Sequence, residues 1–206
     1  MLVAVGGHSR NIGKTSVTAG LISKLRDRKW TAVKITQYGH GACSNHGSDD
    51  ACGCEPDNGE PFALSEEYEP TKTDSGRFLA AGAARSFWLR VPAGELPRAA
   101  KTVHKILRQS ENTIVESNSI LDVVQPDLFL MLLDFGCEDF KASSLRFMDR
   151  ADAFVVIDHG INAPLWEGVA RGLWDHKPQF LVKPPRYVTT QLAEFVTSKL
   201  TAASAR

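Results

Sequence analysis

A lysine and two hydroxyl residues follow a glycine-rich stretch near the start of the chain, in an order that suits phosphate binding. The stretch reads GGHSRNIGKT from Gly6 to Thr15. A glycine turn exposes backbone N–H groups, the Lys14 ammonium can neutralise β- and γ-phosphates, and a threonine at a helix start can hold Mg²⁺. The stretch therefore predicts a phosphate-binding loop, or P-loop. The residues expected to contact a nucleotide are Gly7, Asn11, Ile12, Gly13, Lys14, Thr15 and Ser16.

The spacing of the glycines departs from the usual P-loop by one residue. His8 stands where the first glycine is expected, and Gly7 comes one position earlier. Two alternatives follow. Either His8 occupies the first glycine position, or the loop is one residue longer and Gly6 and Gly7 make the turn.

Apolar runs rich in β-branched residues recur along the chain and are separated by segments of helical periodicity. Several runs lack polar alternation, which is typical of strands covered on both faces. Together they predict an α/β fold of three layers, a mostly parallel sheet flanked by helices, and 206 residues suit a single domain. The expected strands are Leu2–Val5, Thr31–Thr36, Ser86–Val91, Thr113–Glu116, Leu128–Leu133, Ala153–Ile157 and Gln179–Val182; the expected helices are about Lys14–Arg26, Glu95–Arg108, Val188–Leu200 and a surface helix at Lys141–Arg150.

Acidic residues at strand ends could complete a nucleotide site, because ligands collect at the carboxyl ends of parallel strands. Glu116 and Asp134 both end expected strands, although a helix cap is an equal alternative for Asp134. Asp74 and Arg77 lie one helical turn apart at a helix start, where an arginine can bind phosphate. We expect Thr15 and Glu116 to hold Mg²⁺. Catalysis is expected to depend on Lys14, Asp74, Arg77 and Glu116.

The order of these motifs resembles the molybdopterin-guanine dinucleotide biosynthesis protein B family, which belongs to the same broad class of P-loop proteins as dethiobiotin synthetase and the nickel-delivery GTPases. The motifs that carry the resemblance are the loop, Lys34-Ile35-Thr36 with His40-Gly41, Lys72-Thr73-Asp74-Ser75 with Arg77 and Ala81-Gly82-Ala83, and Val115-Glu116.

The resemblance covers most of residues 1–120 and implies a P-loop NTPase fold, with nucleotide-binding roles for Gly13, Lys14 and Thr15 and acidic roles for Asp74 and Glu116. The chain departs from that family in two ways. Glu116 is followed by Ser117 where the family has glycine, and a cysteine-rich segment is inserted. The family's substrate therefore does not carry over.

The inserted segment, at about residues 37–73, is acidic, shows little periodicity and contains three clustered cysteines. A loop of this length without secondary structure is uncommon in a compact domain unless it is functional or disordered. Thiolate and imidazole ligands suit tetrahedral Zn²⁺, so a zinc site is expected at Cys43, Cys52, Cys54 and His46. An iron–sulfur cluster completed by Cys137 is a weaker alternative, and a mobile loop with free thiols is another.

The bulk properties narrow the class of function. A net charge of zero offers no field for nucleic acid or an anionic membrane, and the longest apolar run is too short to cross a bilayer. With no signal-peptide pattern, a cytoplasmic protein is expected. Related P-loop proteins often place the active site near a two-fold interface, which favours a homodimer.

Two functions from different classes remain open. The first is a Mg²⁺-dependent ATP or GTP enzyme, an NTPase or small-molecule kinase that could act in cofactor biosynthesis. The second is a nucleotide-switched metallochaperone or accessory adapter that uses the cysteine segment. The chain lacks the Asn-Lys-x-Asp pattern of guanine recognition, which slightly favours ATP.

Overall fold

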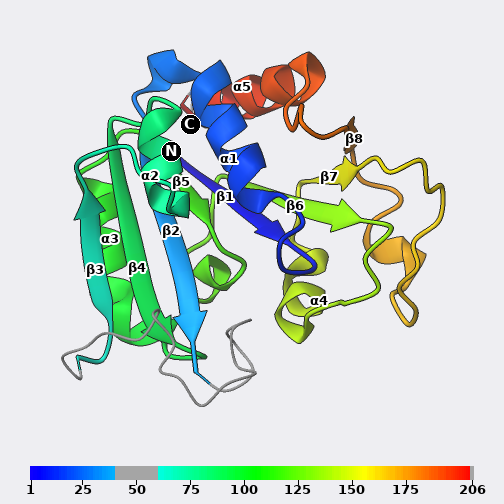
Figure 1. Cartoon of the computed structure of the whole chain (residues 1–206), viewed down its shortest axis with the longest axis horizontal. Helices are drawn as coiled ribbons and strands as arrows, with labels where there is room; N and C mark the ends of the chain where they lie inside the picture. The colour runs from blue at the N-terminus through cyan, green and yellow to red at the C-terminus, as the bar shows by residue number, and fades with distance from the viewer. Residues whose placement is uncertain (40–59, 205–206) are drawn as a thin grey trace.

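The computed structural model describes residues 1–39 and 60–204, and a single eight-stranded sheet organises them (Figure 1). The strand order is β3-β4-β2-β5-β1-β6-β7-β8. Every neighbouring pair is parallel except β3 with β4, so the expected mostly parallel sheet is confirmed. The strands are β1 (Leu2–Gly7), β2 (Thr31–Tyr38), β3 (Ala63–Glu67), β4 (Arg85–Pro92), β5 (Thr113–Glu116), β6 (Leu128–Asp134), β7 (Ala153–Ile157) and β8 (Gln179–Val182).

The first strand, β1, lies in the middle of the sheet between β5 and β6, and all of its residues are buried. Burial on both faces explains why β1 and β6 read as continuous apolar runs rather than alternating ones. Strands β5, β7 and β8 have the bounds expected from the sequence, and the other expected strands are each longer by one or two residues.

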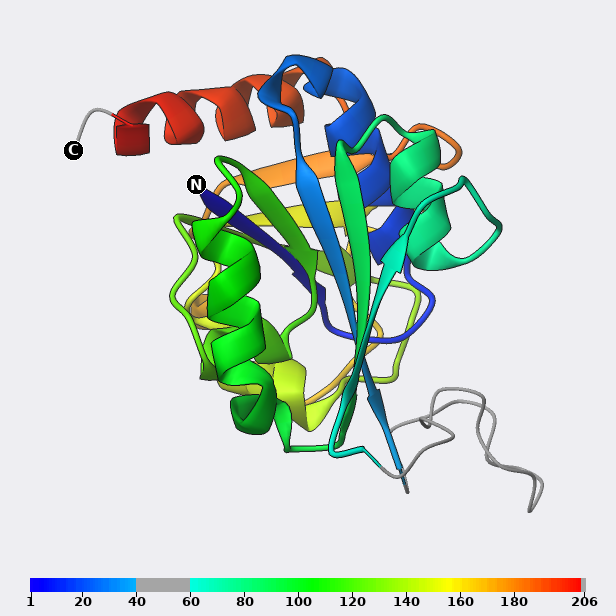
Figure 2. The same cartoon turned by 90° about the vertical axis from the view of Figure 1, so that its left-hand side faces the viewer.

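Helices cover both faces of the sheet, which makes three layers (Figure 2). One face packs against α1 (Lys14–Lys24), α2 (Asp74–Ala80) and α5 (Thr190–Ser204). The other packs against α3 (Ala100–Arg108), the preceding 3-10 helix η2 (Leu96–Ala99), and α4 (Ala142–Met148). Among the described residues, no helix combines the length and the apolar character needed to span a bilayer.

Part of the segment expected to lack secondary structure is a strand, which corrects the boundaries of the insertion. Strand β2 continues to Tyr38, and β3 pairs antiparallel with β4 at the edge of the sheet. The Arg85 guanidinium donates two hydrogen bonds to the Glu66 carboxylate, at 2.8 and 3.1 Å, which fastens β3 to β4. A short, polar edge strand of this kind leaves little periodicity in the sequence.

Helix α2 is anchored so that its first turn meets the carboxyl ends of the strands. The Thr73 hydroxyl caps the helix by accepting a hydrogen bond from the Gly76 N–H at 3.0 Å. The Ser86 hydroxyl of β4 donates to the Ser75 carbonyl at 2.8 Å. These contacts fix the direction in which the first residues of α2 point.

Gly6 offers a test of how tightly β1 packs just before the loop. A Cβ added at Gly6 would lie 2.1 Å from Asn118 Oδ1 and 2.7 Å from the Phe129 ring. We expect Gly6→Ala to lower the free energy of unfolding by about 1–3 kcal/mol through overpacking. The matched control is Gly172→Ala, where an added Cβ has no neighbour within 4 Å. Urea denaturation of the two variants checks the prediction, and equal midpoints would contradict it.

Candidate functional site

The loop between β1 and α1 curls around the side chain of Lys14. Asn11 and Gly13 adopt left-handed conformations with φ of 54° and 95°, and α1 begins at the next residue after Gly13. The Lys14 Nζ donates to the Ser9 carbonyl oxygen at 2.6 Å. The ammonium therefore lies inside the curve of the loop, where the expected P-loop places it.

Gly7 is the last residue of β1 and directly precedes the loop. Its N–H donates to Asn118 Oδ1 at 2.8 Å, and Asn118 Nδ2 donates back to the Gly7 carbonyl at 3.0 Å. Gly7 lines the adjoining cavity, whereas His8 does not. Because β1 ends at Gly7, the loop begins at His8, the position that the first glycine takes in the usual spacing.

His8 is fully buried on the side of the loop that faces away from the cavity, and its ring contacts two other segments of the chain. Its Nε2 accepts from the Asp134 N–H at 3.0 Å, which makes Nδ1 the protonated nitrogen that donates to the Asp139 carbonyl at 3.0 Å. The imidazole also packs on the rings of Phe140 and Trp166, at centroid distances of 4.9 and 4.8 Å. Burial lowers the pKa of His8 to about 4, against the opposing effect of Asp139. The His8 imidazole is therefore uncharged at pH 7 and has a structural role.

A group of charged side chains meets at the other side of the loop. Glu116, at the end of β5, is only 2% exposed. Its Oε2 accepts from the Thr15 hydroxyl at 2.9 Å, and its Oε1 lies 2.5 Å from the Lys34 Nζ. The same ammonium lies 2.7 Å from Asp74 Oδ2. Lys34, in the middle of β2, thus contacts both acids.

The pKa values in this group follow from burial and pairing. Burial opposes the charge of Lys34, but Glu116 and Asp74 outweigh it and raise the pKa of the ammonium. Burial likewise opposes the charge of Asp74, but Lys34 outweighs it and lowers the pKa of the carboxyl. Both groups are therefore charged at neutral pH.

Arg77 connects α2 to the start of α1. Its Nη2 donates to the Ser16 hydroxyl at 3.1 Å, and its Nη1 lies 3.8 Å from Asp74 Oδ1. The guanidinium is close to half exposed, so it keeps donors available to a ligand. A position beside the loop suits an arginine that contacts phosphate.

One cavity of about 1170 Å³ brings most of the expected residues together. All four expected catalytic residues line it, as do all the expected loop residues except Ile12, whose side chain packs in the core. The expected site residues that line the cavity are Gly7, Asn11, Gly13, Lys14, Thr15, Ser16, Asp74, Arg77 and Glu116.

The loop side of this cavity is strongly cationic. Arg10, Lys14 and Lys141 all line it. Burial, followed by the charges of Lys14 and Arg10, lowers the pKa of Lys141 to about 8. Burial also lowers the pKa of Lys14, although Glu116 opposes this effect. An anion with several charges would relieve the repulsion among these groups, so the cavity suits a polyphosphate.

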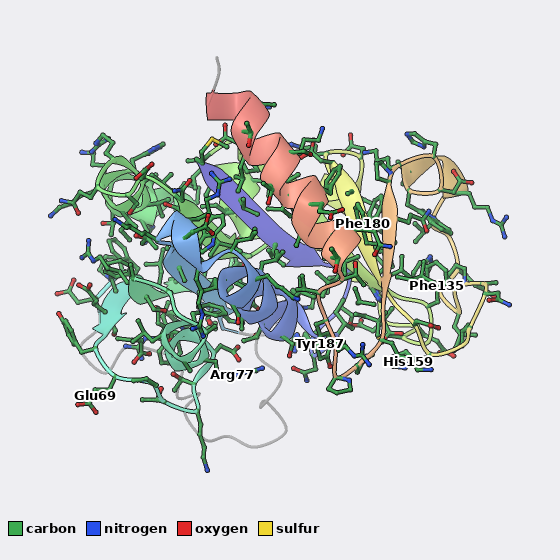
Figure 3. The ribbon with its side chains drawn as sticks, turned by 90° about the horizontal axis from the view of Figure 1, so that it is seen from above. Glu69, Arg77, Phe135, His159, Phe180 and Tyr187 are labelled. Atoms are coloured by element: carbon green, nitrogen blue, oxygen red, sulfur yellow. The ribbon has the colours of Figure 1, made fainter. Side chains whose placement is uncertain are left out.

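Several of the residues that line the cavity were not expected from the sequence. In the sequence, Lys34 stands out only within a motif of the family resemblance, and Lys141 only as the first residue of an expected surface helix. Tyr187 lies against the loop, because a Cβ added at Gly13 would approach its ring to 2.6 Å. Figure 3 shows Tyr187 and Arg77 on either side of α1. The sequence carries no local signal for these roles, since each depends on contacts between distant segments.

Two other candidates do not join the cavity. Asp134 ends β6, where its carboxylate accepts from the Gly136 N–H and lies 3.1 Å from the His159 Nε2. Asp134 therefore lies in the turn after β6 and does not cap the next helix, because α4 begins at Ala142 without a side-chain cap, so the helix-cap alternative is wrong. The expected zinc ligands Cys43, His46, Cys52 and Cys54 lie outside the described residues. Within 1–39 and 60–204, no group of three His, Cys, Asp or Glu residues could hold a metal ion.

The donor set beside the loop nevertheless fits Mg²⁺ bound together with a nucleotide. Mg²⁺ prefers oxygen ligands and is usually held by one or two carboxylates plus phosphate oxygens and water. The Thr15 hydroxyl and the Glu116 and Asp74 carboxylates converge around one cationic group, the Lys34 ammonium. The position thus already attracts positive charge.

Comparison with solved structures identifies the fold. The chain is similar to HypB from Helicobacter pylori, whose crystal structure contains nickel, with a TM-score of 0.55 and 14% identity over 98% of this chain and 87% of HypB. It also matches LpxK from Aquifex aeolicus, in a structure with ATP, with a TM-score of 0.43 and 14% identity over 87% of this chain and 53% of LpxK. The chain has the P-loop NTPase fold, as the sequence predicted.

No protein-family model matches the chain, and no curated protein matches it. The resemblance to the molybdopterin-guanine dinucleotide biosynthesis protein B family therefore depends on its short motifs alone.

His8 should make the stability of the protein depend on acid pH. Its pKa is lowered from 6.5 to about 4 on folding, so the unfolded chain binds the proton more readily. Stability is therefore full above pH 6.5 and is lost as the pH falls toward 4, by about 3 kcal/mol for this shift. Chemical denaturation at several pH values should show a smaller loss in His8→Gln. The exposed His104→Gln should behave as wild type, and equal losses in all three proteins would contradict the prediction.

Proposed function

We propose that the protein is a Mg²⁺-dependent enzyme that binds a nucleoside triphosphate at residues 6–16 and acts as an NTPase or a small-molecule kinase. The observation that carries this proposal is the placement of Lys14 inside the curve of the loop, in a cavity lined by further cations. Backbone N–H groups and an ammonium in this arrangement form a binding site for the β- and γ-phosphates.

Each charged residue has a role that follows from its position. Lys14 neutralises phosphate charge, and Arg77, which reaches Ser16 at the start of α1, contacts the transferred group. Thr15, Glu116 and Asp74 hold Mg²⁺, which when bound neutralises charge on the phosphate oxygens. Since phosphoryl transfer depends mainly on positioning and electrostatic stabilisation, this set of residues suffices for the chemistry.

The cavity extends beyond the phosphate site, which supports a second substrate. Thr36 and Gln37 line it near the carboxyl end of β2, and Trp88 lines it from the middle of β4. The Trp88 Nε1–H donates to the Thr36 hydroxyl at 2.9 Å, which holds the indole along the sheet. An acceptor molecule placed over these residues would lie beside Asp74 and Lys34. This part of the cavity favours a kinase over a simple NTPase.

The nucleoside would lie at the opposite side of the loop, near Tyr187. That residue follows β8 and lies against Gly13. An aromatic ring at this position can stack on a base without selecting between bases by hydrogen bonds. With no Asn-Lys-x-Asp pattern of guanine recognition in the sequence, ATP is the favoured nucleotide.

Replacing Lys14 tests the proposed phosphate site directly. Because charge-assisted hydrogen bonds contribute about 1.5–3 kcal/mol, Lys14→Ala should weaken binding of a non-hydrolysable ATP analogue by roughly ten- to a hundredfold. Lys24→Ala, an exposed change at the other end of the same helix, is the control. Isothermal titration calorimetry gives the affinities. Unchanged affinity in Lys14→Ala would refute the proposal, and Mg²⁺-dependent turnover that is lost in this variant would support it.

A nucleotide-switched metallochaperone or adapter is the alternative function. It is favoured by the clustered cysteines of the insertion and by the nickel in the HypB structure, although likeness at 14% identity shows the fold alone. Under this alternative, the purified protein should contain stoichiometric metal that is lost when Cys43, Cys52 and Cys54 are changed to serine. Cys137→Ser is the control and should keep the metal.

Metal titrations with and without nucleotide separate the two functions. A metallochaperone should change its metal affinity by about fivefold or more when nucleotide binds, because allosteric coupling is typically of this size. A metal affinity that is independent of nucleotide would exclude this alternative and would be consistent with a structural zinc in an enzyme.

A further inference from the structure

Lys34 occupies a position that would also suit a divalent cation. Its Nζ lies 2.5 Å from Glu116 Oε1 and 2.7 Å from Asp74 Oδ2. The other oxygen of Glu116 accepts from the Thr15 hydroxyl at 2.9 Å. The ammonium therefore bridges the two acids that, with Thr15, form the proposed Mg²⁺ site.

We propose that Lys34 makes metal binding conditional on nucleotide. In the nucleotide-free protein its ammonium satisfies both carboxylates, and it releases them only when a bound polyphosphate offers other anionic oxygens. This inference rests on the proposed function, because it takes Thr15, Asp74 and Glu116 as the metal ligands. It assigns Lys34 a positioning role that controls which cation the acids hold.

The Lys34 ammonium and a divalent cation compete for the two acids, because both are positively charged and both would occupy the same position. An ammonium and a divalent cation repel each other, and the repulsion is much stronger in a part-buried site than in water. Lys34 is 17% exposed and Glu116 2%, so water screens the pair poorly. The metal ion and the ammonium therefore compete for the same two carboxylates.

The described part of the cavity offers no second pair of acids to a metal ion. Three carboxylates line it, and the third, Asp139, accepts a hydrogen bond from the Ser9 hydroxyl at 2.5 Å on the loop. A metal ion must therefore take the carboxylates that Lys34 holds. Without another anion nearby, displacing the ammonium would leave it without a partner, which is costly for a buried charge.

A polyphosphate on the loop removes that cost. Lys34 lines the same cavity as Lys14, and its long, flexible side chain can turn from the acids toward phosphate oxygens. Nucleotide binding would then free the carboxylates for Mg²⁺ while the ammonium keeps an anionic partner. Metal and nucleotide would bind cooperatively, and metal alone would bind weakly.

Titration with Mg²⁺ in the absence of nucleotide tests this role. We expect millimolar MgCl₂ to leave the Tm of the wild-type protein and of Lys34→Arg unchanged. In Lys34→Met the acids lose their cation, so MgCl₂ should raise the Tm, and calorimetry should show Mg²⁺ binding at least tenfold tighter than in wild type. Adding Glu116→Gln to Lys34→Met should abolish both effects. A Lys34→Met protein whose Tm does not respond to Mg²⁺ would overturn the proposal, because it would show a purely structural ion pair.

Lys34→Gln, which keeps a hydrogen-bond donor, replaces Lys34→Met if the latter does not fold. A further measurement needs only the wild type, for which Mg²⁺ binding should be at least tenfold tighter with saturating ADP than without it. Equal Mg²⁺ affinities in the two states would refute the role of Lys34. Nucleotide binding is measured separately, in EDTA. A protein that binds no nucleotide would refute the proposed function, whereas the titrations with Mg²⁺ alone would still decide the role of Lys34.

Discussion

The Glu116 carboxylate is almost completely buried between the loop and β2, and the arrangement of the site depends on how its charge is satisfied. A buried charge costs several kcal/mol unless it is paired and hydrogen-bonded. Its partners come from different elements: Thr15 from α1 and Lys34 from β2, and Lys34 in turn contacts Asp74 at the start of α2. Satisfying one carboxylate therefore fixes three elements around the end of β5. An alternative packing that moved any of them would break a hydrogen bond or an ion pair in this group.

Neutral contacts hold the opposite side of the loop. His8 joins the end of β1 to the end of β6 and to Asp139, and Asn118 contacts both the N–H and the carbonyl of Gly7. Since the loop is held from both sides, its N–H groups need little rearrangement to receive phosphate. Preorganisation of this kind is what makes electrostatic stabilisation effective in enzymes. His8, which stands where the usual P-loop has its first glycine, is fully buried, and both of its ring nitrogens are hydrogen-bonded.

Local patterns in the sequence were enough to predict most of the fold and the centre of the site. Continuous apolar runs gave β5, β7 and β8 with their observed bounds, and the order of glycine, lysine and threonine located the loop. The role of Lys34 could not be predicted in this way. It faces Glu116 because β2 pairs with β5 in a register that matches these two residues, although they are 82 positions apart in the chain. Strand β3 could not be predicted for a different reason: a short edge strand has only one neighbour and needs no apolar pattern.

Charge is distributed unevenly between the cavity and the rest of the molecule. The chain as a whole has no net charge, yet five cationic side chains and three carboxylates line the cavity. The fold has thus collected an excess of positive charge at the carboxyl ends of the strands. Low-dielectric walls focus such a field, which raises the local concentration of anionic ligands and favours those with several charges. The same excess would repel a free divalent cation, so a metal ion is expected to arrive with a polyphosphate that masks its charge. Selection for the metal–nucleotide complex would then follow from the field of the whole cavity, with Lys34 acting at the point where the metal must bind.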